Sequence, residues 1–350
     1  MARSSPPRNA PQLSKFLRRK TKNTFPFIGI GIAFLVGVAV LSFPAFYSFQ
    51  LQQEAADRVS KPFPISVDPT HKAIVENPEV DALFNAKSEP LDTVSMGVSG
   101  IFGQIATAIA SIPGYEMLGA VGVRFVTIYP GFRQEQVASA FGKVLHWDTK
   151  EQKEFLSLAN SATSTSREGT FAPGTYVVSD KTNAADVERI LKEKFDDTIL
   201  SRYDSSTAAI IPLDQTLAIA SLLERETSDP NEMRLISGII WNRIWNGMNL
   251  QIDATLQYAK SSANGGKGGE WWPKIAPKDK YIKSPYNTYL HAGLPPAPIA
   301  NPSVAAVIAA LNPKKTDCIF YFHDKNGDFH CSATYKEHVA LLKKSYGQGK

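Results

Sequence analysis

Hydrophobic residues in the C-terminal two thirds of the chain recur with helical spacing, and short alternating segments interrupt them. Apolar positions three and four residues apart predict helices over 134–144, 184–195, 213–227, 230–246, 303–311 and 335–346. Alternation predicts strands in VRFVTIYP, GTFAPGTYVVS and NLQIDATLQY, and a hairpin in CIFYFHDKNGDFHCSATY that turns at Asn326-Gly327. This mixture of elements predicts an α+β fold.

Two of the predicted helices follow each other closely and have clear ends. The first ends near Thr227. The second has Pro230 in its first turn, after Ser228 or Asp229 as the cap, and it stops at Gly247. The short connection predicts two tightly joined helices.

The longest apolar run precedes all of these elements. The segment from Phe25 to Phe49 carries no charge, and it is long enough to cross a bilayer as a helix. A cleaved signal peptide would have a shorter apolar core followed by small residues, whereas bulky Phe46 and Tyr47 stand here. A buried core helix would not explain the basic cluster directly before the run. We therefore predict a single uncleaved transmembrane helix over 25–49 in the cell inner membrane.

Charge distribution sets the expected orientation and excludes one class of partner. The chain has 38 basic and 33 acidic residues, and seven of the basic residues lie in 1–24, which has no acidic residue. Positive flanks stay cytoplasmic, so we expect 1–24 to be a cytoplasmic tail and everything after about residue 50 to lie outside. Without the tail the chain is slightly acidic, and we exclude nucleic acid as a partner.

Residues 50–120 show no regular pattern. They are first polar and interrupted by prolines, and then rich in small apolar residues. A second membrane segment is disfavoured because Asp92 and Pro113 bound a run that is too short. We predict a stalk with one helix packed on the body, then a small αβ module over 121–204 and a mixed α+β domain over 205–350.

The only two cysteines, Cys318 and Cys331, flank the predicted hairpin. With its turn as predicted, Cys318 lies opposite Tyr335 and Cys331 lies opposite Phe322, so the two sulfurs are several residues out of register. We therefore expect no disulfide bond between them and favour simple hairpin packing. A zinc site with the two histidines of the hairpin is the alternative, but the spacing fits no structural zinc pattern.

Glu226 shares a helix face with aliphatic side chains. It follows Leu223 and Leu222 by three and four positions and Ile219 by seven, whereas Glu224 points nearly the opposite way. A carboxyl group on an apolar face is desolvated, which raises its pKa and keeps it protonated near neutral pH, as a general acid requires. From periodicity alone, however, a helix-end glutamate that is exposed or paired with arginine is the commoner case.

Patterns for serine acylation, zinc proteolysis and nucleotide chemistry are absent from the sequence. Carboxylate chemistry is left, and we expect no metal and no cofactor. Tyr286, Asn287, Thr288 and Tyr289 bring aromatic and amide groups together, and a proline-stiffened stretch presents Asn301. Such groups suit sugars, although a proline-rich corner that only holds the fold fits the composition equally well.

Several separate motifs resemble the YceG-like family of endolytic murein transglycosylases. They are ASLLERET, SGIIWNRIWNGMNLQIDAT, SPYNTYLHAGLPPAPIANP and the terminal hairpin followed by TYKEH, in matching order through roughly residues 210–340. The resemblance implies that Glu226, the second acid of the first motif, is catalytic. It also implies a diverged LysM-like module over 121–204 and a YceG-like catalytic domain over 205–350. The chain departs from the family at 253–255, where Asp-Ala-Thr replaces Asp-Pro-Thr, and at Ala297 in the proline-rich motif.

The resemblance also implies a reaction. Protonated Glu226 would donate to the oxygen of the β-1,4 bond from N-acetylmuramic acid to N-acetylglucosamine, and the muramic acid's own C6 hydroxyl would close on C1 to leave a 1,6-anhydro end. Because the nucleophile belongs to the substrate, no second carboxylate is required. The expected partners are peptidoglycan glycan strands, the inner membrane and cell-wall synthesis proteins. The expected substrate contacts are Gln251, Asp253, Tyr286, Asn287, Thr288, Tyr289 and Asn301.

Two alternatives stay open. A muramidase would use Asp253 to activate water and would leave reducing ends in place of anhydro ends. A scaffold without catalytic activity would bind glycan through the small module and recruit synthesis proteins, and its cellular function would survive Glu226→Gln.

Overall fold

The computed structural model describes residues 62–85, 123–161 and 168–347, together with the isolated helical positions 37, 38, 42, 43 and 46. The chain divides into two units, Met1–Phe43 and Pro44–Lys350, and the elements below belong to the second. Within the described residues, no helix is both long and apolar enough to span a membrane. Apart from the isolated positions, the predicted tail and transmembrane helix lie outside the described part of the chain.

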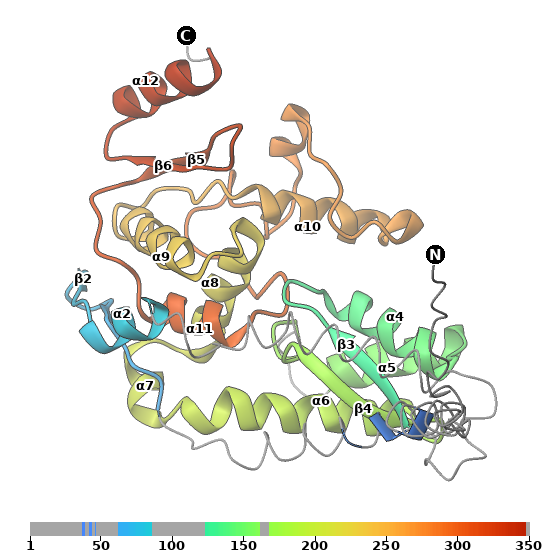
Figure 1. Cartoon of the computed structure of the whole chain (residues 1–350). Coiled ribbons are helices and arrows are strands. Elements are labelled where there is room, and N and C mark those ends of the chain that lie inside the picture. Colours follow the sequence, from blue (N-terminus) through green and yellow to red (C-terminus); the bar gives the residue numbers. More distant parts are fainter. Residues whose placement is uncertain are drawn as a thin grey trace, which may run out of the picture. The chain divides into compact units, whose positions relative to one another are not determined.

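An antiparallel strand pair with two helices between its strands forms the first module. Figure 1 shows the two strands side by side next to these helices. Val123 pairs with Ser179 at one end of the ladder and Ile128 pairs with Gly174 at the other. A third helix follows and packs on the second. The elements are β3 (Val123–Ile128), α4 (Gln134–Leu145), α5 (Thr149–Ser161), β4 (Gly174–Ser179) and α6 (Ala184–Thr198).

The module has its own core, in which aromatic rings dominate. Phe141 contacts both Trp147 and Tyr176, with ring centroids 6.3 and 5.8 Å apart, and Phe155 contacts Phe171 at 5.7 Å. The sequence patterns predict β3, β4, α4 and α6, whereas α5 was not predicted. Its polar sequence TKEQKEFLSLANS offers a narrow apolar face, in which Phe155 is fully buried and Leu156 and Leu158 are partly buried against the core.

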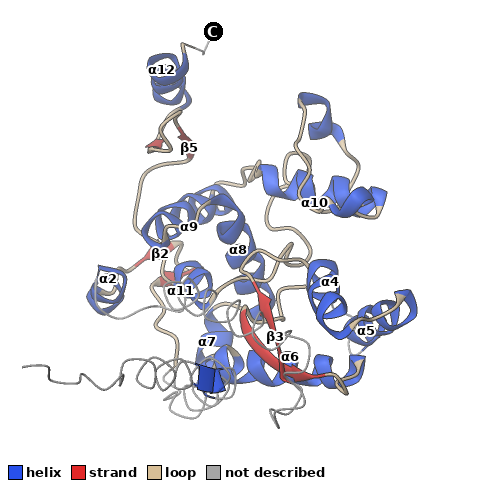
Figure 2. Ribbon diagram, turned by 45° about the vertical axis from the view of Figure 1, so that its right-hand side comes forward, coloured by secondary structure: helices blue, strands red, loops and turns tan. Residues whose placement is uncertain are grey.

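Three mutually packed helices form the centre of the second region (Figure 2). They are α8 (Leu213–Glu226), α9 (Pro230–Trp245) and α11 (Val304–Leu311), all three predicted from the sequence to within a residue or two. Every residue of α11 except Val304 is buried, because α11 packs against both α8 and α9. The capping residues are as the sequence indicates, since the Asp229 carboxylate accepts hydrogen bonds from the first turn of α9.

Shorter elements surround this centre. Tyr203 closes the connection from the module by donating a hydrogen bond from its hydroxyl to the Ile211 carbonyl at 2.5 Å. The remaining elements are η2 (Leu200–Arg202), α7 (Ser205–Ile210), α10 (Asp253–Asn264), η3 (Lys267–Gly269), η4 (Pro277–Tyr281), the antiparallel hairpin β5 (Phe320–His323) and β6 (Phe329–Ser332), and α12 (Tyr335–Tyr346).

The prediction of a strand in NLQIDATLQY is wrong. The structure has no strand there: Ile252 alone is shown as extended, directly before α10 begins at Asp253. Apolar residues alternate from Leu250 to Leu256, which is a strand pattern, but Tyr258 and Ala259 continue the buried face with helical spacing. The alternation therefore continues into the first turn of α10, which explains why the prediction failed.

Part of the predicted stalk is packed on the body. Residues 62–85 form the short pair β1 (Val67–Asp68) and β2 (Ala73–Ile74) and the helix α2 (Pro78–Asn85). Phe63, Val67 and Val80 are buried in the same core as α8, α9 and α11. The other residues of 50–120 lie outside the described part of the chain.

The expectation that the two cysteines are not bonded is also wrong. Cys318 and Cys331 form a disulfide, with their Cα atoms 5.8 Å apart. The register prediction assumed that the ladder continues through Cys318, but β5 starts only at Phe320. Before it, the Asn242 side chain donates hydrogen bonds to the carbonyls of Thr316 and Cys318 at 2.7 and 3.0 Å. Cys318 therefore lies before the paired residues, and Cys331 pairs with Tyr321 and not with the predicted Phe322.

Candidate active site

Glu226 is the last residue of α8, where the helix leaves the core. Ile219, Leu222 and Leu223 on the same face are fully buried, and Glu226 is half-buried. The next residue, Thr227, is extended and donates a hydrogen bond from its hydroxyl to the Glu232 carboxylate of α9 at 2.7 Å. The tight connection between α8 and α9 therefore fixes the direction in which the Glu226 side chain points.

Glu226 opens into a cleft with a volume of about 540 Å³. One wall is strand β5 of the hairpin with the start of α12, and another is the segment that leads into α10. The lining residues are Glu226, Arg243, Gln251, Ile252, Asp253, Lys280, Tyr289, Phe320, Tyr321, Phe322, His323, Tyr335 and His338. Acidic, cationic and aromatic side chains thus meet in a single concave site, which is typical of ligand-binding clefts.

The cleft favours the protonated form of Glu226. Desolvation raises the pKa of the Glu226 carboxyl above its usual value, and the negative charge of Asp253 raises it further. Three interactions lower the pKa. They are the hydrogen bond that the Tyr321 hydroxyl donates to Oε2 at 2.9 Å and the charges of His323 and Arg225. Because desolvation dominates, the carboxyl is suited to act as a general acid and, once ionised, as a base.

Glu224 lies two residues earlier and has a different environment. Its Oε2 accepts hydrogen bonds from the backbone N–H and the hydroxyl of Ser303, at 2.9 and 2.7 Å. Ser303 caps α11, so Glu224 supports a helix N-terminus and does not line the cleft. The structure therefore separates the two acids of the ASLLERET motif into one structural and one cleft-lining residue.

Arg243 of α9 ties two walls of the cleft together. Its Nε donates to the Ile319 carbonyl, just before β5, at 2.6 Å, and its Nη1 donates to the Leu250 carbonyl, just before Gln251. Arg243 is only 7% exposed, and desolvation lowers the pKa of its guanidinium. It therefore holds the hairpin and the segment leading into α10 at a fixed separation.

Three of the predicted substrate contacts lie in the cleft with Glu226. They are Gln251, Asp253 and Tyr289. The Tyr289 hydroxyl donates to the Asp253 carboxylate at 2.5 Å. Gln251 has a φ of 51°, which is unusual for a residue other than glycine, and its N–H donates to the Thr288 carbonyl at 3.0 Å. This backbone conformation presents Gln251 at the exposed edge of the cleft.

Three other predicted contacts, Tyr286, Asn287 and Thr288, support the cleft from behind. Asn287 is 0% exposed and its Nδ2 donates to the carbonyls of Lys280 and Ile282 at 3.0 and 2.8 Å. Thr288 is 1% exposed and its hydroxyl accepts from the Ile252 N–H at 3.0 Å. The ring of Tyr286 packs on that of Tyr258 at 4.7 Å. In this conformation Asn287 and Thr288 hold the loop that carries Tyr289 and do not face the cleft.

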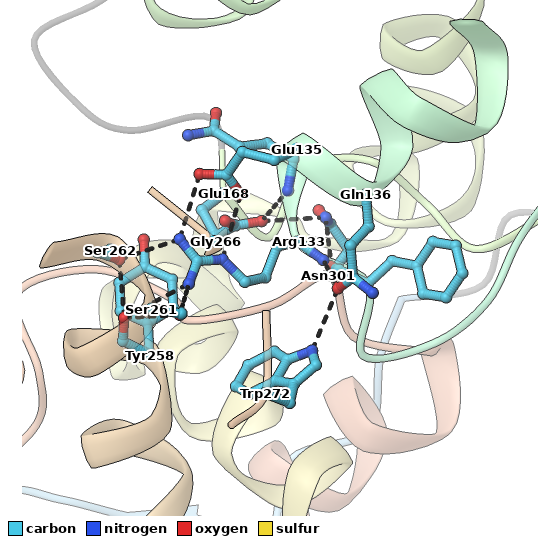
Figure 3. A network of polar contacts seen from close by, with 12 residues as sticks. Arg133, Glu135, Gln136, Glu168, Tyr258, Ser261, Ser262, Gly266, Trp272 and Asn301 are labelled. Carbon is cyan, nitrogen blue, oxygen red and sulfur yellow. Dashed lines mark hydrogen bonds and ion pairs between the residues drawn. The ribbon is translucent and has the colours of Figure 1, made fainter. Parts of the chain in front are cut away.

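Asn301, the last predicted contact, belongs to a buried polar network at the junction between the module and the second region (Figure 3). Asn301 is 0% exposed. Its Nδ2 donates to the Phe132 carbonyl at 2.8 Å and to Glu168 Oε1 at 3.1 Å, and its Oδ1 accepts from the Phe171 N–H at 2.9 Å. The residue is a structural link, because no ligand can reach it in this arrangement.

Arg133 is the centre of the same network, and it is 1% exposed. Its guanidinium donates to the hydroxyls of Ser261 and Ser262 on α10, at 2.6 and 3.0 Å, and pairs with Glu135 at 3.1 Å. Close by, the Trp272 indole N–H donates to the Gln136 side chain at 3.1 Å (Figure 3). The network joins the module to α10, whose first residue, Asp253, lies in the cleft.

Sequence reasoning missed the residues that the hairpin brings to the cleft. Tyr321 and His323 alternate along β5, and His323 Nε2 lies 3.1 Å from the Glu232 carboxylate. The alternation of Tyr and His in FYFH was a usable signal, but nothing in the sequence indicates that this strand crosses the end of α8. Among the residues that the structure describes, no three His, Cys, Asp or Glu are grouped so as to hold a metal ion.

Comparisons with known proteins point to one family. The model of the YceG-like family matches residues 104–344. A protein of Bacillus subtilis (strain 168) named endolytic murein transglycosylase is 28% identical over 241 residues, which is 63% of this chain and 65% of that protein. A protein of the same name from Streptococcus pneumoniae serotype 2 is 28% identical over 171 residues, 49% of this chain and 30% of that protein. The chain thus spans less than two thirds of the length of these relatives.

A solved structure shares the fold. The crystal structure of a yceG-like protein from Listeria monocytogenes superimposes with a TM-score of 0.56 and covers 69% of this chain and 80% of that one. The sequence identity is 23%, so this likeness concerns the fold alone. It supports the mixed arrangement of helices and small sheets described above.

Proposed function

The chain belongs to the YceG-like family, and from this premise we propose that it is a membrane-anchored endolytic transglycosylase of peptidoglycan. The name shared by the bacterial relatives supports the substrate and the reaction class. The observation that carries the proposal for this chain is the position of Glu226, a half-buried carboxyl with a raised pKa, in a cleft large enough for sugar rings.

The proposed reaction needs a single carboxyl that acts twice. Protonated Glu226 donates its proton to the oxygen that links C1 of N-acetylmuramic acid to N-acetylglucosamine, and the bond between C1 and that oxygen breaks. The resulting carboxylate accepts the proton of the C6 hydroxyl of the same muramic acid while that oxygen bonds to C1. No water is consumed, Glu226 returns to its protonated form, and a 1,6-anhydro end results.

Two further parts of the proposal concern regions outside the cleft. The uncharged run 25–49 with its basic flank supports a single-pass anchor in the inner membrane, with the cleft on the extracytoplasmic side and near cell-wall synthesis proteins. The module of 121–204 has two helices between two antiparallel strands, an arrangement compatible with a LysM-like glycan-binding module. A glycan held by the module would be retained near the cleft between successive cuts.

The test is cleavage of purified uncrosslinked glycan strands by the full-length chain, followed by mass spectrometry of the fragments. We expect anhydro-muramyl ends from the parent and none from Glu226→Gln. Glu224→Gln is the matched control, because it lies on the same helix and keeps an acceptor oxygen for Ser303. It should cut like the parent, which would separate the chemistry of the cleft from the stability of α8.

A muramidase is the second candidate, because Asp253 stands in the same cleft and its charge acts on Glu226. Fragments one water heavier, with reducing ends, would favour this hydrolase and would contradict the lytic reaction. Intact glycan from the parent, with cellular function retained in Glu226→Gln, would favour a scaffold that binds glycan without cutting it.

A further inference from the structure

The two carboxyl oxygens of Glu226 have different surroundings. Oε2 accepts a hydrogen bond from the Tyr321 hydroxyl at 2.9 Å. No residue in the described part of the chain donates to Oε1, and Oε1 is not among the enclosed atoms that lack a partner. It is therefore open to the cleft that Glu226 lines. A substrate oxygen can approach Oε1 directly, whereas the phenol of Tyr321 already occupies the approach to Oε2.

We propose that Tyr321 is a positioning residue that keeps the acidic proton of Glu226 on Oε1, the oxygen that faces the substrate. This inference rests on the proposed function, because it assigns the proton that the reaction consumes. If Oε2 carried the proton and donated it to Tyr321, the tyrosine would lose the one hydrogen bond that its hydroxyl donates to a described residue. In the opposite arrangement the phenol donates to Oε2, and the acidic proton on Oε1 faces the cleft, where a substrate oxygen can accept it.

The same hydrogen bond assists the step in which Glu226 loses its proton. A hydrogen bond to an ionised oxygen is roughly twice as strong as one to a neutral oxygen. Tyr321 therefore stabilises the carboxylate more than the acid, which favours proton transfer to the leaving sugar. Burial and the nearby charge of Glu226 hold the pKa of Tyr321 well above its usual range, so the phenol stays a donor throughout.

Packing fixes the Tyr321 ring independently of its hydroxyl. The ring stacks on Phe329 of β6 with centroids 5.9 Å apart, and Tyr321 pairs with Cys331 in the ladder. Cys331 is in turn bonded to Cys318. Phenylalanine at position 321 can keep these contacts, so Tyr321→Phe removes the hydroxyl without an expected loss of the hairpin.

Several charged or titratable groups face Glu226, and only one changes in this variant. They are Arg225 on α8, Arg243 on α9, Asp253 on α10, Tyr289 on its loop, and Tyr321 and His323 on β5. The hydrogen bond from Tyr321 opposes the effect of desolvation on the pKa of Glu226. Its removal is therefore expected to raise the pKa of Glu226, with the other groups unchanged.

The experiment compares full-length parent, Tyr321→Phe and Tyr281→Phe in the formation of anhydro ends as a function of pH. Tyr281 is 77% exposed and does not line the cleft, which makes it a matched control for the loss of a phenol. In Tyr321→Phe we expect kcat to fall about tenfold to hundredfold, as for a lost hydrogen bond to a charged group. KM should change little, and the alkaline limb of the profile should move to higher pH. Tyr281→Phe should match the parent.

A fall in kcat without a shift of the alkaline limb would reduce Tyr321 to a structural residue and overturn the proposal, as would an unchanged rate. A second readout does not depend on cleavage. Carboxyl carbon NMR, with the Glu226 signal identified by its absence in Glu226→Gln, titrates Glu226 directly, and Tyr321→Phe should raise its pKa. If the parent cuts no glycan, the proposed function fails, while this titration still decides whether Tyr321 acts on Glu226.

Discussion

Glu168 in the junction and Glu226 in the cleft are both glutamates whose pKa is raised mainly by desolvation. Glu168 is 1% exposed, and its Oε1 accepts from the Gln134 N–H at 2.9 Å and from the Asn301 amide at 3.1 Å (Figure 3). Glu226 has one hydrogen bond, from Tyr321, and an oxygen that is open to the cleft. The junction encloses its carboxyl on all sides, whereas the cleft leaves one side for a ligand.

This difference shows that a raised pKa does not by itself identify a catalytic acid. Desolvation raises the pKa of Glu168 as it raises that of Glu226, so the direction of the shift does not separate the two residues. What distinguishes Glu226 is access, because a general acid must approach the atom that it protonates. The comparison therefore predicts that changes in the cleft act on the reaction and that changes in the junction act on stability.

The largest expected effect comes from the same substitution made in the two regions. Glu226→Gln should lower kcat by at least about a hundredfold, because general acid–base groups typically contribute 10²- to 10⁴-fold. Glu168→Gln should retain kcat within about threefold when it is assayed well below its unfolding temperature, since the amide resembles the protonated acid. Rates on isolated glycan strands check both. Equal losses in the two variants would refute the distinction between the cleft and the junction.

A second prediction concerns the stability supplied by Arg133. Arg133→Met removes a guanidinium that is 1% exposed and leaves Ser261, Ser262 and Glu135 without its hydrogen bonds. Breaking such a buried network typically lowers the free energy of unfolding by about 3–5 kcal/mol. Urea unfolding followed by circular dichroism gives this quantity. Arg189→Met is the control, because Arg189 forms only exposed pairs on α6 and should change stability little.

The disulfide provides a prediction in which one change lowers both stability and catalytic rate. Replacing Cys318 and Cys331 by serine removes a crosslink that closes a loop with a sequence separation of 13, which is worth about 3 kcal/mol in the chain-entropy account. Because the hairpin also carries Tyr321 into the cleft, kcat should fall as well. A reducing agent should lower both the stability and the kcat of the parent. It should cause no further change in the double variant, which has already lost the bond. Loss of stability with unchanged kcat would show that the hairpin keeps its place without the bond.

Local signals were sufficient for much of the scaffold. Proline at 230, the Asp229 cap and the apolar stripe before Glu226 gave α8 and α9 correctly, since helix ends and faces depend on neighbouring residues. The same reasoning failed for α10, whose first residues alternate like a strand. Propensity and periodicity are weak where a segment is short and both patterns fit it.

The site was predictable only in part, because its residues meet across long sequence separations. Glu226 follows from its motif and its stripe, but its partner Tyr321 is 95 residues away on a strand whose path is not encoded locally. Composition also misled, since the amide of Asn301 suits a sugar and a buried backbone equally well. The contacts of Asn301 with Phe132 and Phe171 show that it serves the backbone, which a local pattern cannot reveal.

The smallest effect in this series is a dependence of stability on pH that originates in the junction. The folded state holds the pKa of Glu168 well above its usual value of 4.5, mainly through desolvation and the charge of Glu135. The folded chain therefore binds the proton of Glu168 more tightly than the unfolded chain does. This contribution is fully present below the unfolded pKa and is lost as the pH rises through the folded pKa.

Because Glu224 and Glu226 also have raised pKa values, only the difference between the parent and Glu168→Gln isolates the junction. The free energy of unfolding of the parent, relative to Glu168→Gln, should decrease as the pH rises above about 4.5, by at most about 1.4 kcal/mol per pH unit. Urea titrations of both proteins over this range give the slope. A relative stability that increases with pH would mean that Glu168 is ionised in the folded chain. The charge of Arg133 would then outweigh desolvation, and the junction would hold an ion pair where the cleft holds an acid.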